Sequence, residues 1–264
     1  MTSALSVSRL QSGQAEQIWI EQQLAAGLKA PAMAVVNYRR PCLIYGRRGG
    51  DNAAAHGRAA LLYYAITQRR SGGGAVLAGP WMLGLNLLLP AEHPCAALSH
   101  VQAFNWFGRV WQQALADLGI ACRLANAEQF QQHQRLVQQH RLDWVCFAGI
   151  SHGELLDTEG RKVLGLAQYR GRWGTLLSAG LLTATTPWEE LEFIHTGQRP
   201  ECSALHTLTA PLPQLDTPVA RQALLACLLN HLHTPSITTT GESLCKAFAI
   251  SAATRRPAPG CCAP

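Results

Sequence analysis

Three consecutive glycines follow a pair of arginines in the first third of the sequence. The run reads Arg69-Arg70-Ser71-Gly72-Gly73-Gly74-Ala75. Glycine has no Cβ, so its backbone N–H groups can approach a carbonyl, carboxylate or phosphate closely, and the arginines supply positive charge. No Gly-Lys-Ser/Thr sequence follows the run, which argues against a P-loop. Taken alone, the run is equally typical of a flexible hairpin turn.

A second chemical signal is a lysine in an apolar segment. The chain has only three lysines, and one of them, Lys162, begins a stretch that alternates like a strand. In such a strand Lys162 shares a face with Leu164 and Leu166, which places its ammonium in an apolar setting unless it reaches out along the sheet edge. A surface lysine beside a turn is the competing interpretation. If Lys162 faces a pocket, Lys162→Ala is expected to spare the fold.

The third signal is Cys146, next to Phe147 at the end of an apolar segment, with Ser151 and Glu154 beyond it. Buried cysteine is commonly inert, so Cys146 by itself favours a structural role. The nine cysteines are irregularly spaced and form no CxxC pair, and the histidines are isolated or two residues apart. The sequence therefore supports neither a zinc site nor a disulfide network.

Composition limits the remaining classes. The 264 residues, 48% hydrophobic and 14% charged, suffice for one sizeable core, and we expect a catalytic domain over residues 1–233 and a partly disordered tail over 234–264. No apolar run approaches the roughly 20 residues of a membrane span, and no signal pattern occurs, so a cytoplasmic location is expected. The net charge of +6 favours an acidic partner, and no nucleic-acid motif accompanies it.

Helical periodicity predicts helices over residues 14–28, 53–64, 101–118 and 224–232. Short apolar or alternating segments predict strands over residues 32–38, 42–46, 65–68, 82–89, 143–147, 154–157, 162–168 and 175–182. Helices and strands are mixed without strict alternation. This pattern favours an α+β fold in which helices cover a sheet.

Together these motifs resemble a known superfamily. The arginine pair followed by Ser71 to Val76 is similar to the signature of lipoate-protein ligase A. The later residues resemble the strand-turn-strand of the same superfamily, which also includes biotin-protein ligases, and especially its cysteine-dependent octanoyltransferase branch. They are Cys146-Phe147, Ser151, Glu154, Gly160-Arg161-Lys162, Gly165, Ala167-Gln168 and Arg170. Their order and separation match, and weaker similarity runs from about Ala15 to Leu215.

The resemblance implies a biotin/lipoate synthetase-like fold, a mixed and largely antiparallel sheet flanked by helices. It implies that Lys162 contacts the acyl carbonyl or an activated acyl group, and that Cys146 carries the acyl group as a thioester. The glycine loop, with Gly165 and Ala167, would line the acyl and the nucleotide or pantetheine pocket. An ammonium favours a neighbouring thiolate and stabilises a developing oxyanion, which suits both roles.

The function implied is transfer of an octanoyl or lipoyl group to one lysine of a lipoyl domain or a glycine-cleavage carrier protein. The leading interpretation is a cysteine-dependent octanoyltransferase, with acyl carrier protein as a possible donor and no permanently bound cofactor. The alternatives are an ATP- and Mg-dependent lipoate-protein ligase and a binding protein without catalysis. Where the family has a His-Asp pair after its glycine loop, this chain has Ala78-Gly79-Pro80-Trp81. No C-terminal accessory domain is recognisable, which favours the transferase.

Overall fold

The computed structural model describes residues 5–49 and 53–233, so the expected tail over residues 234–264 lies outside the described residues. The strands are β1 (Ser6–Leu10), β2 (Ala32–Asn37), β3 (Cys42–Tyr45), β4 (Ala65–Gln68), β5 (Val76–Ala78), β6 (Met82–Pro90), β7 (Arg123–Leu124), β8 (Leu155–Leu156), β9 (Lys162–Gly171) and β10 (Gly174–Leu182). The helices are α1 (Gly13–Ala25), α2 (Ala53–Leu61), α3 (His100–Asp117), α4 (Ala127–Gln139), α5 (Trp188–Thr196), α6 (Leu205–Leu208) and α7 (Pro218–His233), with 3-10 turns η1 (Pro94–Ala96) and η2 (Pro213–Leu215).

The strands form two sheets. The larger has the order β1-β2-β6-β10-β9-β8-β7, with β1 and β2 parallel and the other neighbours antiparallel. The smaller has the order β4-β3-β5. The predicted α+β class with a largely antiparallel sheet is therefore confirmed. No helix in the described part of the chain has the length and apolarity needed to cross a membrane.

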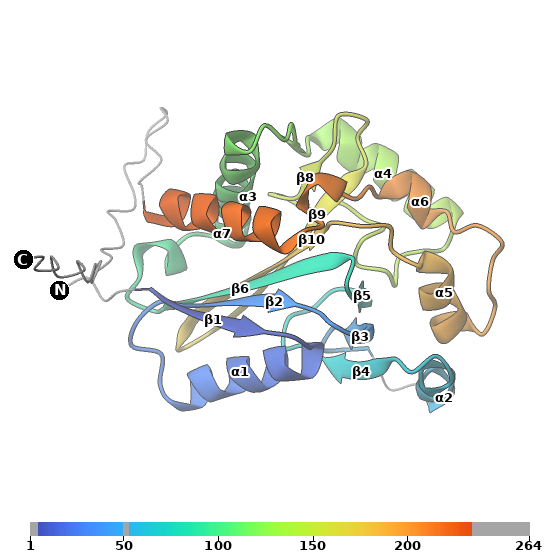
Figure 1. Cartoon of the computed structure of the whole chain (residues 1–264), viewed down its shortest axis with the longest axis horizontal. Coiled ribbons are helices and arrows are strands. Elements are labelled where there is room, and N and C mark those ends of the chain that lie inside the picture. The colour runs from blue at the N-terminus through green and yellow to red at the C-terminus, as the bar shows by residue number, and fades with distance from the viewer. Residues whose placement is uncertain (1–4, 50–52, 234–264) are drawn as a thin grey trace, which may run out of the picture.

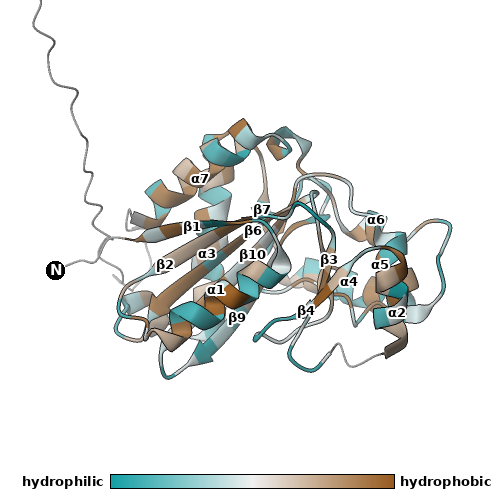
Figure 2. Cartoon of the chain, turned by 60° about the horizontal axis from the view of Figure 1, so that its bottom comes forward, coloured by the Kyte–Doolittle hydropathy of each residue, from teal (hydrophilic) through white to brown (hydrophobic). Residues whose placement is uncertain are grey.

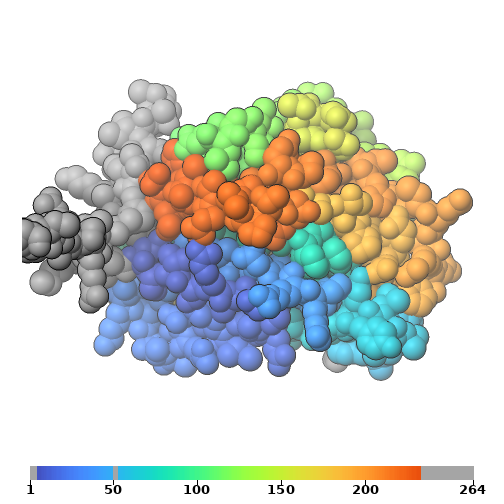
Figure 3. Space-filling model, viewed as in Figure 1, coloured from blue at the N-terminus to red at the C-terminus, as the bar shows by residue number. Residues whose placement is uncertain are grey.

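Helices cover both faces of the large sheet (Figure 1). On one face Phe107 and Trp111 of α3 share a buried cluster with Leu228 of α7. On the other face Trp19 and Ile20 of α1 pack against the central strands. Figure 2 shows these strands as largely hydrophobic, and Figure 3 shows the orange-red α7 lying against the blue N-terminal segments. The sheet is thus buried between the two helical layers, which fixes it as a rigid frame.

Capping explains where the most strongly predicted helix begins and ends. Ser99 caps α3 and forms a reciprocal capping box with Gln102, and Gly119, with φ of +73°, follows the helix. The prediction missed α4, because its buried face is only His133 and Val137 within a glutamine-rich segment. It also missed β1 and α5.

The predicted strand over residues 143–147 is wrong. This segment turns, and it meets the chain after the glycine loop through one isolated bridge between Ala75 and Val145. The Ala75 N–H donates to the Trp144 carbonyl oxygen at 2.7 Å, and the Cys146 N–H donates to the Ala75 carbonyl oxygen at 2.9 Å. Apolar residues were therefore a correct sign of burial but not of a strand, because this loop is buried by its neighbours.

The predicted face of Lys162 is also wrong. The pairing of β8 with β9 shifts register at the start of β9, and both Val163 and Leu164 join the cluster beneath α3. The Lys162 Cε lies 3.4 Å from where a Cβ on Gly165 would stand, on the side away from Leu164. A β-bulge adds one residue to a strand and so reverses the alternation. Lys162 therefore faces the same side as Gly165, and not that of Leu166.

Two helical glycines give a test of this packing. In α3 a Cβ on Gly108 would lie 1.9 Å from the Gly153 carbonyl oxygen, whereas in α2 a Cβ on Gly57 would meet no atom within 4 Å. Gly108→Ala should lower the free energy of unfolding by about 1–3 kcal/mol, although alanine is the better helix former. Gly57→Ala should raise it by up to about 1 kcal/mol. Urea denaturation measures both, and equal gains would contradict the close approach of α3 to the 149–154 loop.

Candidate active site

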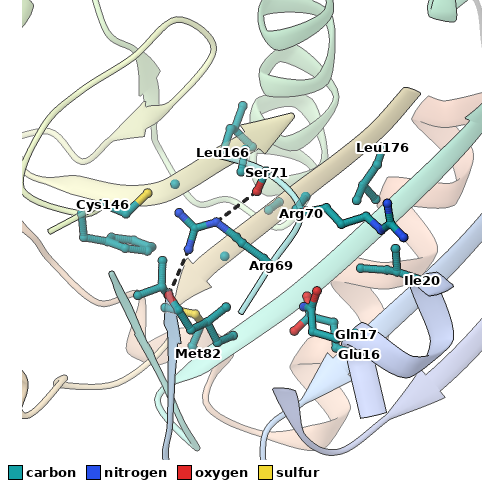
Figure 4. Close-up of a pocket in the computed structure, with 18 of the residues that line it drawn as sticks. Glu16, Gln17, Ile20, Arg69, Arg70, Ser71, Met82, Cys146, Leu166 and Leu176 are labelled. Atoms are coloured by element: carbon teal, nitrogen blue, oxygen red, sulfur yellow. Dashed lines mark hydrogen bonds between the residues drawn. The ribbon is translucent and has the colours of Figure 1, made fainter. Parts of the chain in front are cut away.

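Two pockets adjoin at Cys146. The polar pocket, of about 1050 Å³ including the solvent at its mouth, has walls from the glycine loop, Glu154 and Lys162. The apolar pocket, of about 600 Å³ counted in the same way, extends from Cys146 towards Ile20 and Leu176 (Figure 4). Cys146, Leu166 and Ala167 line both pockets. The thiol-bearing residue therefore stands where an apolar chamber meets a polar one.

Lys162 is buried beside this junction with a full set of acceptors. Its side chain is 1% exposed. The Nζ donates to the carbonyl oxygens of Cys146 at 3.0 Å and Gly149 at 2.8 Å, and it pairs with the Glu154 Oε2 at 2.8 Å. The Phe147 ring centroid lies 5.1 Å from the same nitrogen. A buried ammonium requires such partners, so Lys162 fixes the turn that carries Cys146.

Glu154 connects this lysine to the rest of the site. Its carboxylate, 2% exposed, also accepts the Ser151 N–H at 2.7 Å and the Leu166 N–H at 2.9 Å. One carboxylate therefore holds Lys162, the loop before it and strand β9 together. The sequence analysis included Glu154 in a motif but did not name it as a site residue. The available signal was a carboxylate just before the turn that leads to one of the few lysines.

Arg69 holds the glycine loop in place. It is buried, and its guanidinium donates to the Ser71 Oγ at 3.0 Å and to the carbonyl oxygens of Ile44, Gly72 and Gly74 at 3.0, 2.9 and 2.8 Å. Its donors are directed at the loop itself. The expectation that Arg69 supplies charge to a ligand therefore gives way to a positioning role.

The glycines of the loop are required by close approach to the segment of Cys146. A Cβ on Gly74 would lie 2.2 Å from the Trp144 carbonyl oxygen. Gly73 has φ of +92°, a backbone conformation that other residues rarely adopt, and its Cβ would lie 3.8 Å from the Cys146 Sγ. The loop thus passes next to the thiol, and Ala75 ties it there through its backbone.

Arg70 differs from its neighbour because it is on the surface. It pairs with Glu21 of α1 and lies 5.9 Å from the Tyr169 ring centroid. It lines the apolar pocket with Gln17, and Figure 4 shows both at the end away from Cys146. Arg70 is placed to meet a ligand at that end.

The floor of the apolar pocket is formed by Gly165, Ala167, Ser178 and Gly180, which belong to two adjacent cross-strand rows. One row is Ala34, Asn86, Ser178 and Ala167, and the other is Val36, Gly84, Gly180 and Gly165. Residues two apart on a strand share a face, so both rows face the same side of the sheet. The glycines leave space above the sheet, which Met82, Phe147 and the Tyr38 hydroxyl partly fill. Gly165 and Ala167, two of the predicted residues, are part of this floor.

A polar network lies in the wall of this apolar pocket, and the sequence analysis missed it. The Glu16 carboxylate accepts the Tyr38 hydroxyl at 2.8 Å and the Asn86 amide at 2.7 Å, and the Asn86 oxygen accepts the Ser178 hydroxyl at 2.6 Å. Burial raises the pKa of Glu16, against the effect of these hydrogen bonds. Burial, reinforced by Glu16, also raises the pKa of Tyr38 well above its ordinary value. The available signal was an acidic residue beside Trp19 and Ile20 on the buried side of α1.

The segment that replaces the His-Asp pair forms the tight turn between β5 and β6. The Trp81 indole N–H donates to the Leu77 carbonyl oxygen at 3.0 Å, and its ring fills the space beside Gly79. The turn thus presents packed apolar groups where the resemblance led us to expect two titratable ones.

The sequence and the fold of this chain are similar to those of known proteins. A family model described as the lipoyl protein ligase A/B catalytic domain matches residues 14–205, more than half of the chain. No curated protein gives a match. A solved structure of lipoate-protein ligase A bound with ATP is similar at a TM-score of 0.63 and 14% identity, covering 88% of this chain and 86% of that chain.

A putative lipoate protein ligase from T. acidophilum with bound lipoic acid is similar at a TM-score of 0.60 and 13% identity, covering 88% and 84% of the two chains. A bipartite lipoate protein ligase and its E2 lipoyl domain from Thermoplasma acidophilum is similar at 0.55 and 12%, with the same coverage. At these identities the structural likeness shows a shared fold.

The Lys162–Glu154 pair gives a prediction about stability. Removing one partner leaves the other buried without its counterion, so Lys162→Ala and Glu154→Ala should each lower the free energy of unfolding by about 3–5 kcal/mol. The double variant should lose less than the sum, because the interaction is lost only once. Guanidinium denaturation of the three variants tests this. Wild-type stability in Lys162→Ala would restore the expectation from sequence that this lysine is dispensable for the fold.

Proposed function

The chain belongs to the lipoyl protein ligase A/B catalytic domain family, and from that premise we propose that it transfers an octanoyl or lipoyl group, by way of a Cys146 thioester, to one lysine of an acceptor protein. The observation that carries the proposal is the position of Cys146 between the apolar and polar pockets. An acyl chain in the apolar pocket brings its carbonyl carbon to the thiol. The polar pocket then receives the group that departs and the amine that arrives.

The chemistry has two balanced steps. In the first, the Cys146 sulfur attacks the carbonyl carbon of an acyl thioester donor, the new C–S bond replaces the old one, and the donor thiol leaves with the cysteine proton. In the second, a lysine amine of the acceptor attacks the Cys146 thioester, an amide forms, and Cys146 leaves as a thiol. Both steps pass through a tetrahedral oxyanion.

The surroundings of Cys146 suit this oxyanion. Gly73 brings backbone close to the sulfur and Gly74 lies against the Cys146 backbone, both without side chains, and we assign their N–H groups to the oxyanion. Lys162 lines the same pocket, and its ammonium donates to the Cys146 carbonyl oxygen. Its three donors are taken by two carbonyl oxygens and Glu154, so we assign it the positioning of the loop, and any effect of its charge on the oxyanion acts through space.

The apolar pocket suits a medium acyl chain. Its floor is made of glycine, alanine and serine, and its walls include Ile20, Met82 and Leu176. Burying about seven methylene or methyl groups at about 0.8 kcal/mol each contributes roughly 6 kcal/mol to binding. That is enough to hold the chain while its carbonyl is positioned for attack.

The acceptor class follows from the family and from charge. A solved neighbour on this fold is a bipartite lipoate protein ligase with its E2 lipoyl domain, which supports a lipoyl domain as acceptor here, and a glycine-cleavage carrier protein is the related alternative. An acidic acceptor suits a chain of net charge +6. Acyl carrier protein is the proposed donor because it presents a thioester.

A second candidate is an ATP-dependent lipoate-protein ligase. One similar structure is lipoate-protein ligase A bound with ATP, and the open polar pocket of this chain has room for a nucleotide. In that mechanism Lys162 contacts an acyl-adenylate and Cys146 only packs. The two candidates therefore differ in whether Cys146 becomes acylated and whether ATP is needed.

Cys146 provides the direct test. The full chain incubated with octanoyl-acyl carrier protein should gain the mass of one octanoyl group, and hydroxylamine should remove it because the bond is a thioester. Cys146→Ser should gain no such adduct and should lose transfer at least about 100-fold. Cys122→Ser is the matched control, since this partly buried cysteine lies outside both pockets. Normal transfer by Cys146→Ser that requires ATP would establish the ligase instead.

Acceptor recognition gives a further prediction. A panel of lipoyl domains and glycine-cleavage carrier proteins, assayed by mass spectrometry, should show acylation of one lysine in an acidic member. The rate should fall several-fold as salt rises from about 50 to 500 mM, because screening shortens the reach of the basic surface. A failure to modify any domain, with and without ATP, would leave a binding protein on this fold.

A further inference from the structure

The apolar pocket contains a group of polar atoms that the proposed transfer reaction does not use. Glu16, Tyr38 and Ser178 all line it, together with Ile20 and Leu176. In Figure 4, Glu16 lies with Ile20 at the end of the pocket away from Cys146. A chain attached to Cys146 therefore directs its far end towards this carboxylate.

The network has acceptor capacity to spare. A carboxylate can accept about four hydrogen bonds, and among the described residues two donors reach Glu16, one on each oxygen. The Ser178 hydroxyl gives its hydrogen to Asn86, so its oxygen lone pairs face the pocket as acceptors. The buried guanidinium of Arg69 directs its donors to Ser71 and to carbonyl oxygens instead.

Closing a purely hydrocarbon tail against these atoms is unfavourable. It removes water from a carboxylate and a hydroxyl and returns no hydrogen bond. A tail that ends in an O–H or N–H group replaces that water with a bond to a buried acceptor. Sites built to hydrogen-bond a ligand discriminate strongly against analogues that lack the donor, because their polar atoms are otherwise left unpaired.

We propose that Glu16 and Ser178 form a distal subsite that selects an acyl group bearing a hydrogen-bond donor, a hydroxyl or an N–H, at the end away from its carboxyl carbon. Asn86 and Tyr38 position the Glu16 carboxylate for this contact. The inference rests on the proposed function in one respect, that the apolar pocket holds the acyl chain. It adds a preference within medium acyl chains, for one that ends in a donor over octanoyl or lipoyl, which carry none.

The test measures how tightly the full chain binds two ligands of equal size. In 8-hydroxyoctanoic acid a hydroxyl replaces the terminal methyl of nonanoic acid, so their binding differs by the donor alone. Isothermal titration of the free acids and their shorter and longer homologues requires no catalysis. Wild-type protein should bind the best hydroxy acid at least about tenfold more tightly than its alkyl partner, the range of a hydrogen bond to a charged group.

Variants separate the subsite from general packing. Ser178→Ala, which keeps Glu16 and its two donors, should reduce the preference several-fold, and Glu16→Gln should reduce it further. Ser8→Ala is the matched control, because Ser8 accepts the Trp19 indole N–H against the same helix and lies outside the pocket. That variant should retain the wild-type ratio.

Two results overturn the inference, and they are distinguishable. If each alkyl acid binds as tightly as its hydroxy partner while Cys146 still accepts octanoyl, the distal subsite is wrong and the transfer function stands. If neither series binds, the pocket holds no acyl chain, and the inference falls together with the proposed function.

Discussion

The site depends first on the buried ion pair between Lys162 and Glu154. Bringing an ammonium and a carboxylate out of water costs several kcal/mol for each ion, and only good geometry with additional hydrogen bonds offsets that cost. Here the lysine contacts two carbonyl oxygens and the carboxylate accepts two backbone N–H groups. The pair therefore imposes one arrangement on three separate pieces of chain, namely the turn at Cys146, the loop at Ser151 and strand β9.

A second buried cation does the same for the opposite wall. The guanidinium of Arg69 binds the carbonyl oxygens of the glycine loop, and the loop then bonds through Ala75 to the backbone of Cys146. Both walls of the site thus consist of loops fixed by a cation to their own carbonyl groups. The sheet below contributes the floor, and its glycine row leaves the space between the walls. Catalytic groups held in this way are preorganised, because little of the loop must move for a ligand to bind.

The sequence predicted the class of fold, and it named several residues that the structure brings together at the candidate site, for identifiable reasons. Gly73 and Gly74 could be recognised because close approach leaves a signature of missing side chains, and Lys162 because lysine is rare in this chain. The face of the strand on which Lys162 lies could not be predicted, because the bulge depends on how β8 pairs with β9 and not on the residues near Lys162. Arg69 looked like a ligand group because sequence does not reveal which carbonyl oxygens a guanidinium will find. Glu16 escaped notice because its partners, Tyr38 and Asn86, are distant in sequence.

The turn at Trp81 bears on how protons are balanced in the proposed reaction. An acceptor lysine has an ordinary pKa of about 10.4, so it loses one proton before it attacks and a second as the amide forms. With apolar packing in place of a His-Asp pair, this turn provides no base. On the thioester route solvent takes the first proton and the departing Cys146 thiolate takes the second. In this route the leaving group, the Cys146 thiolate, also accepts the second proton. The first proton leaves the acceptor lysine for solvent before the attack, so the site needs no further base. This requirement is consistent with a site whose two buried cations hold the loops in place and whose polar pocket is open to water.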